Sequence, residues 1–166
     1  MRQKIKKFDL VFVFLGVAFV VCALFLPKSG KFALLDVAAD CIILLGIAIY
    51  LFLKIRKLNG GIKKNLYVFV VSLLFALFGL LSTKSMVMDA ISGPKEIELH
   101  NVHLSKLQGI KGIITLNYYL QGSDSEGKDY EIEISSDVYY HWRKTETIDI
   151  TYYKNTKRLY ELGGGK

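Results

Sequence analysis

Three histidines, His100, His103 and His141, are the residues whose side chains could most readily hold a metal ion or move a proton. Zinc prefers four nitrogen or sulfur ligands in a tetrahedral arrangement. On a β-strand, residues 100 and 103 point to opposite faces, so both could bind one ion only at a bend or bulge. No cysteine lies nearby as a further ligand. The sequence therefore predicts surface or interface histidines, with no metal and no other cofactor.

The segment 122–128, GSDSEGK, matches the letters of a phosphate-binding P-loop, in which backbone amides at the start of a helix hold the phosphate. Asp129 stands where that motif needs a serine or threonine, and the residues after it alternate like a strand. Asp124 and Glu126 would also repel a phosphate. We interpret the segment as an acidic hairpin loop. Weak calcium binding is the alternative, although the EF-hand spacing is absent.

Other catalytic patterns are missing from the sequence. There is no G-x-S-x-G motif, and spacing alone singles out no Ser-His-Asp set and no pair of catalytic carboxylates. The sequence therefore predicts a protein that is not an enzyme, and a membrane-anchored enzyme using the three histidines is kept as an alternative.

Asp36 and Asp40 lie one helical turn apart inside an apolar run. A carboxylate within a membrane costs a few kcal/mol unless it is paired, hydrated or protonated. For Asp36 we favour an interfacial helix start, with the carboxylate among the lipid headgroups. For Asp40 that interpretation stands beside a functional one, in which the carboxylate is an ion or proton site or contacts a basic partner helix. The functional interpretation predicts a small transport or ion-coupled membrane protein that uses Asp40.

These aspartates belong to one of three apolar runs, at about residues 8–26, 32–53 and 66–82. A helix of about 20 residues crosses a hydrocarbon core of about 30 Å. The apolar side chains surround each helix instead of lining one face, which is typical of transmembrane helices. The sequence predicts a transmembrane domain at 1–88 with three spans. A signal peptide cleaved near Cys22 is the alternative for the first run.

Basic residues flank these runs unevenly. Nine lie before the first run or between the second and third (Arg2, Lys4, Lys6, Lys7, Lys54, Arg56, Lys57, Lys63 and Lys64), and three lie on the other side (Lys28, Lys31 and Lys84). The positive-inside rule therefore predicts a multi-pass protein of the cell membrane with a cytoplasmic N-terminus and an extracytoplasmic C-terminal domain. Asn59–Gly61 is the predicted cytoplasmic turn. Because orientation explains the net charge of +7, the sequence predicts no nucleic-acid partner.

After a predicted linker at 89–94, residues 95–162 alternate between apolar and polar side chains, the period of half-buried strands. Five such runs occur, at 96–104, 112–120, 130–135, 147–153 and 158–162. Residues 136–144 interrupt the alternation and predict a helical turn capped by Ser135, Ser136 or Asp137. The predicted fold is membrane α + β: three transmembrane helices, then a small five-stranded antiparallel barrel or sandwich of the OB or SH3 kind. Residues 163–166 are a predicted flexible tail.

Neighbouring tyrosines in these strands place one ring inside and one outside. The predicted partner-binding surface consists of outward aromatic rings at Tyr119, Tyr139, Tyr140, Trp142 and Tyr153. Together with an exposed strand edge, it predicts a protein or peptide partner outside the bilayer, as in an accessory subunit or an immunity-type protein. Small residues in the apolar runs allow close helix packing, within one chain or in an oligomer (Gly16, Ser72, Ala76 and Gly79).

The order of these pieces resembles that of uncharacterised small bacterial membrane proteins in which spans precede a C-terminal β domain. The resemblance is carried by the 122–127 hairpin, by Ile134-Ser135 and by the closing segment 150–157, ITYYKNTK. It covers the last 70 residues and concerns structure alone. It implies a bacterial envelope protein and no particular activity.

Overall fold

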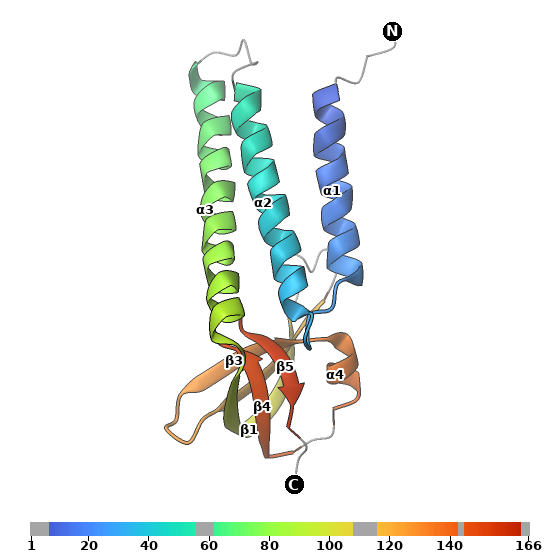
Figure 1. The fold of residues 1–166 in the computed structure, drawn as a ribbon, viewed down its shortest axis with the longest axis vertical. Helices are drawn as coiled ribbons and strands as arrows, with labels where there is room; N and C mark the ends of the chain where they lie inside the picture. Colours follow the sequence, from blue (N-terminus) through green and yellow to red (C-terminus); the bar gives the residue numbers. More distant parts are fainter. Residues whose placement is uncertain (1–6, 56–61, 108–115, 143–144, 164–166) are drawn as a thin grey trace.

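The computed structural model describes residues 7–55, 62–107, 116–142 and 145–163. Three long helices stand side by side and lead into a small β domain at one end of the molecule (Figure 1). The helices are α1 (Lys7–Phe25), α2 (Ala33–Ile55) and α3 (Ile62–Ser92), and the β domain adds a short helix, α4 (Ser136–Tyr140). The predicted turn at Asn59–Gly61 and the last three residues of the predicted tail lie outside the described residues.

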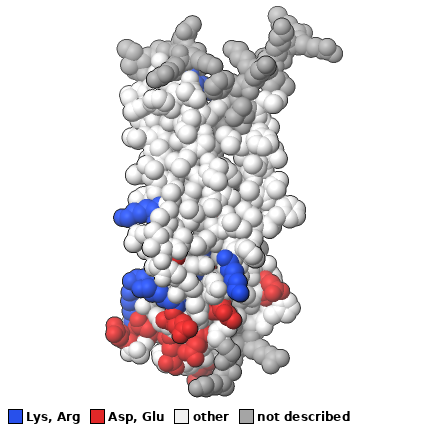
Figure 2. All heavy atoms as spheres, viewed as in Figure 1, with Lys and Arg blue, Asp and Glu red and all other residues white. Residues whose placement is uncertain are grey.

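Two helices in the described part of the chain are long and apolar enough to cross a membrane: α2, and α3 from Asn65 to Ser92. In α3 only 11% of the most apolar window is buried, and in α2 33%, whereas the core helix of a soluble protein would be mostly buried. Figure 2 shows the helical half of the molecule almost free of charged side chains, with charge gathered on the β domain. The predicted count of three spans is not confirmed, since α1 does not meet the same test within the described residues.

The third helix is longer than predicted. It continues to Ser92, so most of the predicted linker at 89–94 is helical, and the chain changes direction only at Gly93, whose φ is +70°. The segment that was expected to lose helical structure contains methionine, alanine and isoleucine, which a helix tolerates, and the first strong helix breakers are Gly93 and Pro94. As a result α3 carries Asp89 to the surface of the β domain.

Helices α2 and α3 pack closely through small residues. A Cβ atom at Gly79 would lie 2.8 Å from Leu45 Cδ2, so any larger residue at this crossing would require the Leu45 side chain to shift. Ser72 Oγ donates a hydrogen bond of 2.8 Å to the carbonyl oxygen of Ala48. The predicted small-residue contacts at positions 72 and 79 therefore occur within the chain.

The β domain is a closed five-stranded barrel with the strand order β1-β2-β3-β5-β4. The strands are β1 (Lys95–Leu107), β2 (Asn117–Ser123), β3 (Asp129–Ile134), β4 (Thr147–Tyr153) and β5 (Arg158–Leu162). Four pairs are antiparallel, but β3 and β5 are parallel, which corrects the prediction of an all-antiparallel domain. A closed ring with an odd number of strands cannot alternate in direction throughout, so closure itself requires one parallel pair.

The inward positions of the strands fill the barrel. Fully buried aliphatic side chains from all five strands form its centre (Leu99, Leu120, Ile132, Ile134, Ile150 and Leu159). The predicted helical turn is α4, and its cap is Ser135, whose Oγ accepts a hydrogen bond from the Val138 amide at 3.3 Å. Alternation thus predicted the strands, except that β2 is Asn117–Ser123 where 112–120 was expected, and residues 112–115 lie outside the described part of the chain. Closure of the barrel sets which strands are neighbours.

Candidate functional site

A β-bulge in β1 changes the direction of the two neighbouring histidines. His100 pairs with Ser123, and His103 pairs with Gln121. The two histidines are three residues apart on β1, but their partners are only two apart on β2, so β1 contains one extra residue. Asn101, with φ +53°, accommodates it. Both histidines consequently face outward on the same side of the sheet. On a regular strand they would point to opposite faces, and the bulge is the exception that the prediction named.

The histidines have hydrogen-bond partners of their own. His100 Nδ1 lies 3.3 Å from Thr147 Oγ1, and His103 Nδ1 lies 3.2 Å from the carbonyl oxygen of Asn101. Within the described ranges, no group of three or more His, Cys, Asp or Glu side chains is arranged to hold a metal ion. His141 is on a different element: it directly follows the last residue of α4 and contacts Asp137 in the first turn of that helix.

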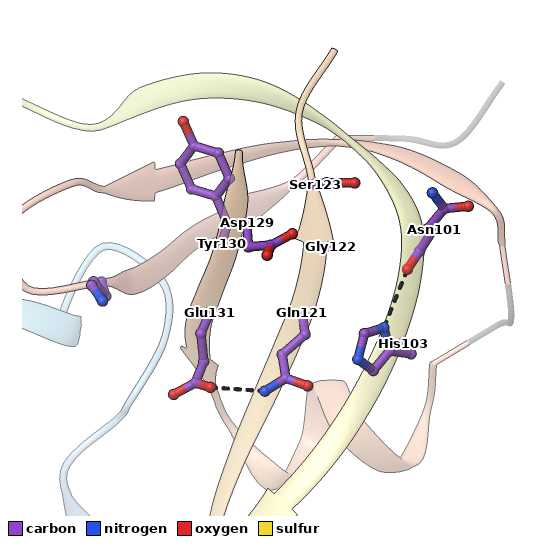
Figure 3. Close-up of a pocket in the computed structure, with 9 residues that line it drawn as sticks. Asn101, His103, Gln121, Gly122, Ser123, Asp129, Tyr130 and Glu131 are labelled. Carbon is purple, nitrogen blue, oxygen red and sulfur yellow. Dashed lines mark hydrogen bonds between the residues drawn. The ribbon is translucent and has the colours of Figure 1, made fainter. Parts of the chain in front are cut away.

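The bulge lies beside a polar groove on the outer face of β1, β2 and β3 (Figure 3). Its volume is about 540 Å³. Nine residues line it: Asn101, His103, Gln121, Gly122, Ser123, Asp129, Tyr130, Glu131 and Lys157. Figure 3 shows Gln121 and Glu131 side by side on adjacent strands, where Gln121 Nε2 donates a hydrogen bond of 2.7 Å to Glu131 Oε2. We call this site the barrel groove.

The floor of the barrel groove requires a residue without a side chain. A Cβ at Gly122 would lie 3.0 Å from the carbonyl oxygen of His100, so a larger residue would require the backbone of β1 to shift by a few tenths of an ångström. The walls supply amide, imidazole and hydroxyl groups, two carboxylates at Asp129 and Glu131, and one ammonium at Lys157. This set can form hydrogen bonds to a polar ligand and favours a neutral or basic one over a phosphate.

The predicted acidic hairpin is present, but Gly122 and Ser123 belong to β2, and the loop is limited to residues 124–128. Asp124 caps it, accepting hydrogen bonds from the Lys128 amide at 2.9 Å, the Glu126 amide at 3.0 Å and the Tyr130 hydroxyl at 3.0 Å. These bonds, led by the one from Lys128, lower the pKa of the Asp124 carboxyl. The pKa of Tyr130 is raised by burial and by its bond to Asp124. Because Tyr130 lines the groove, the hydrogen bond from its hydroxyl to Asp124 holds one edge of the groove in place.

A second polar cluster joins the helices to the barrel. Arg158, at the start of β5, donates a 2.8 Å hydrogen bond to Asp36 of α2, and its other terminal nitrogen lies 2.8 Å from Glu133 of β3. Lys28 reaches the same carboxylate at 3.5 Å and donates a 2.9 Å bond to Asn117. Asp36 is fully buried. Asp36 lies in the first turn of α2, as predicted for a helix start, and its carboxylate is paired with a buried arginine of the barrel.

Asp89 makes a further link that sequence reasoning missed. Its carboxylate is fully buried and accepts four hydrogen bonds from the β4–β5 turn: two from Asn155 at 2.9 and 2.7 Å, and two from Thr156 at 2.6 and 2.8 Å. An acid shortly before the Gly93-Pro94 pair and an arginine at the start of the last strand were the available signals. Neither identified its partner.

Between these links lies a cleft of about 320 Å³, which we call the junction cleft. It is lined by Val37 and Asp40 of α2, by Leu81, Ser82 and Ser85 of α3, and by Glu133, Asn155, Thr156 and Arg158 of the barrel. Asp40 is half-buried in this wall. The two aspartates of α2 thus have different positions: Asp36 lies in the ion pair and Asp40 at the cleft.

The five predicted partner-binding aromatic residues do not form one exposed surface. Tyr140 is 65% exposed, Tyr119 is half-buried, and Tyr139 and Trp142 pack against the barrel core. Tyr153 is buried against Tyr160, with ring centroids 5.6 Å apart, so it is unavailable to a partner. Tyr118, Tyr139 and Tyr140 form a local ring cluster instead. Barrel closure also gives every strand two neighbours, which leaves little of the predicted free edge.

Comparisons with protein-family models, curated proteins and solved structures found no match to this chain. Its function is therefore to be inferred from its own residues and their geometry.

Proposed function

We propose that this chain is a non-enzymatic, multi-pass protein of the bacterial cell membrane whose extracytoplasmic barrel binds a protein or peptide partner in the barrel groove. In this proposal α1 crosses the membrane beside α2 and α3. Its 19 residues are sufficient for a span, and the start of α1 and the end of α2 lie at the end of the molecule far from the barrel (Figure 1). Lys7 begins α1, Lys54 lies in the last turn of α2, and Lys63 and Lys64 lie in the first turn of α3, which supports a cytoplasmic N-terminus.

The strand order supports an OB-type barrel over an SH3-type one. In an OB fold the five strands close in the order β1-β2-β3-β5-β4, with a helix between β3 and β4, and α4 occupies that place here. In OB folds the face of β2 and β3 is a ligand-binding face, used there for oligonucleotides and oligosaccharides. The barrel groove lies on this face, which is the single observation that carries the proposal.

The chemistry of the groove favours a peptide over a nucleic acid. Its carboxylates at Asp129 and Glu131, with the nearby hairpin acids Asp124 and Glu126, would repel a phosphate backbone. Amide and hydroxyl groups at Gln121 and in the neighbouring strands can pair with peptide N–H and C=O groups. A basic or neutral segment of a partner protein is therefore the expected ligand.

The two polar links also suit a binding module. Asp36 with Arg158, and Asp89 with the β4–β5 turn, fix the barrel against the helices, so the groove is held in one orientation relative to the membrane. A preorganised surface loses little freedom when a partner binds. This supports an accessory subunit or an immunity-type protein, which must meet its partner at a constant position.

Topology is tested by cysteine labelling of intact cells carrying Ser125→Cys or Asn59→Cys, each in a background with Cys22 and Cys41 replaced. An impermeant maleimide should label position 125 and leave position 59 unlabelled until the cells are opened. The reverse pattern would refute an extracytoplasmic barrel.

Partner binding is tested by placing a photo-crosslinking residue at Gln121 or Ser123 in the full-length protein in native membranes. A discrete crosslinked band should form at both groove positions. The matched control places the residue at Glu98, which faces outward from the β1–β4 pair opposite Asp149. Equal crosslinking at all three positions, or none at the groove positions, would refute a groove-specific partner.

A further inference from the structure

We propose that exposed lysines at the junction of the helices and the barrel bind the phosphate groups of anionic phospholipids and so rest the barrel on the membrane surface. The inference rests on the membrane placement of α2 and α3 proposed above. It depends neither on the barrel groove nor on which side of the membrane the barrel occupies, because the lysines belong to the junction itself.

Five exposed lysines lie where the helices meet the barrel, and we call them the lysine rim: Lys31, Lys84, Lys95, Lys154 and Lys157. Lys154 and Lys157 flank the two turn residues whose bonds to Asp89 hold the β4–β5 turn against the last turn of α3. Lys95 is the first residue of β1 and follows the end of α3 by three residues. Lys31 follows Gly30, whose amide donates a 2.9 Å hydrogen bond to the carbonyl oxygen of Leu159 in β5. The rim therefore belongs to the junction and not to the far end of the barrel.

The length of α3 sets the level of the rim in a bilayer. A helix rises about 1.5 Å per residue, so about 20 residues counted from Leu66 cross a hydrocarbon core of about 30 Å. The hydrocarbon then ends close to Lys84, and the remaining turns of α3 pass through the headgroup layer. Leu80 and Ile91 are exposed apolar residues on either side of Lys84, so lipid can surround α3 as far as the barrel. Because a lysine has a long flexible stem, the ammonium of Lys84 can reach the same phosphates as those of the barrel lysines.

The exposed charge of the junction is basic, because its carboxylates are already engaged. Asp36 and Asp89 are fully buried, the first paired with Arg158 and the second with the β4–β5 turn. Glu133 is paired with both Arg158 and Lys28. The rim lysines, in contrast, form no side-chain hydrogen bond or ion pair with the residues that the structure describes. Their ammonium groups are therefore available to an anionic ligand.

The distribution of charge over the barrel favours an anionic lipid surface. Figure 2 shows Lys and Arg side chains on the barrel beside the helices, and most Asp and Glu side chains farther away. The acids are thus kept from the lipid phosphates. An ammonium has three donors for phosphate oxygens, and each lysine near an anionic membrane surface increases the affinity about fivefold. Phosphatidylcholine carries a cation beside its phosphate, so phosphatidylglycerol is the better ligand.

The test measures photo-crosslinking of the full-length protein in phosphatidylcholine vesicles that contain a small fraction of photoreactive phosphatidylglycerol or photoreactive phosphatidylcholine, with the same reactive group close to each headgroup. Crosslinks are mapped by mass spectrometry, and only those in residues 84–95 and 153–158 are counted, because the basic residues at the other end of the helices also attract phosphatidylglycerol. We expect the yield with phosphatidylglycerol to be about fivefold higher, the contribution of about one lysine per lipid. Equal yields with the two lipids would overturn the proposal.

A matched pair of variants tests the position of the lysines. Lys154→Gln and Lys128→Gln each remove one exposed lysine from a turn of the barrel, but Lys128 lies in the β2–β3 hairpin, which projects away from the helices (Figure 1). Lys154→Gln should lower the preference at residues 153–158 at least about twofold, and Lys128→Gln should leave it unchanged. The triple variant Lys84→Gln, Lys95→Gln and Lys154→Gln should bring the two yields close to equality. Equal effects at positions 128 and 154 would overturn the proposal.

Two measurements on the unaltered protein keep the test independent of how the variants fold. Raising the salt concentration from 50 to 500 mM should remove most of the preference, since salt screens exposed charges, and a constant preference would overturn the proposal. Soluble glycerol phosphate at the concentration of the lipid should leave the crosslinks in place. Displacement would overturn the lipid assignment in favour of a site for free phosphate. Cysteine labelling and crosslinking from Gln121 are read separately, so the orientation and the barrel groove can fail while the lysine rim stands, and the reverse.

Discussion

Arg158 of β5 and Asp36 of α2 form a buried ion pair with a 2.8 Å hydrogen bond, although 122 positions separate them in the sequence. Side-chain exposure is 8% for Arg158 and 0% for Asp36. An ion pair this well shielded from water is sensitive to loss of one partner, because the remaining charge is left buried. The pair thus makes the position of the barrel depend on the first turn of α2.

Arg158→Leu should lower the free energy of unfolding by about 3–5 kcal/mol, because it removes the buried cation that pairs with Asp36 and leaves Glu133 with Lys28 alone. Unfolding of the full-length protein in micelles can be followed by the fluorescence of Trp142, the single tryptophan. The double variant Asp36→Leu with Arg158→Leu should recover much of the loss, since it removes both charges. The exposed Lys154→Leu is the control and should change stability by less than about 0.5 kcal/mol. Equal effects at positions 154 and 158 would contradict the importance of the ion pair.

Asp89→Ala should release the β4–β5 turn from the end of α3. Four hydrogen bonds to a carboxylate are lost and two backbone amides lose their acceptor, at a cost of about 3 kcal/mol. Hydrogen exchange should become faster at Asn155 and Thr156 and stay unchanged in the β2–β3 hairpin. Asp129→Ala, at an exposed aspartate, is the control and should leave exchange in the turn unchanged. Unaltered protection in Asp89→Ala would show that the turn is held by other contacts.

Gly79→Ala should separate α2 from α3. The new methyl group would lie 2.8 Å from Leu45 Cδ2, and overpacking of this kind costs about 1–3 kcal/mol. The helical circular dichroism signal during titration with a denaturing detergent reports the change. Gly16→Ala is the matched control, because no heavy atom lies within 4 Å of its added methyl group. Adding Leu45→Ala to Gly79→Ala should restore part of the lost stability, because it removes the side chain that the new methyl group contacts. If stability is not restored, the contact with Leu45 is not the cause of the loss.

The β2–β3 hairpin should weaken in acid. Because the folded-state pKa of Asp124 is lowered, chiefly by the Lys128 amide, its ionised form is favoured by folding. The resulting stabilisation is full above the unfolded pKa of about 4, and it is lost as the pH falls below that value through the lower folded pKa. The amide resonances of Glu126 and Lys128 should follow this transition. In Asp124→Asn the chemical shifts of these amides should not change with pH over this range. A midpoint of the transition above about pH 4 in the unaltered protein would contradict the prediction.

Local patterns in the sequence predicted much of the architecture. Hydropathy located the three helices to within a few residues at most ends, and alternation located the strands, because both signals depend on neighbouring side chains. The Asp124 hairpin and the Ser135 cap were also predictable, since each is completed within about six residues. The end of α3 was missed, because the segment at 89–92 was interpreted as a linker although no strong helix breaker precedes Gly93.

The sequence by itself thus determined the type and order of the elements and the segregation of apolar from charged residues. Only the tertiary structure decided that Asp36 pairs with Arg158, that Asp89 holds the turn at 155–156, and that Tyr153 is buried. It also decided the bulge at Asn101, which turns His100 and His103 to one face beside the barrel groove. The physical reason is range: closing a barrel of five strands and docking it on the helices brings together residues that are far apart in the sequence, and no local pattern records that distance.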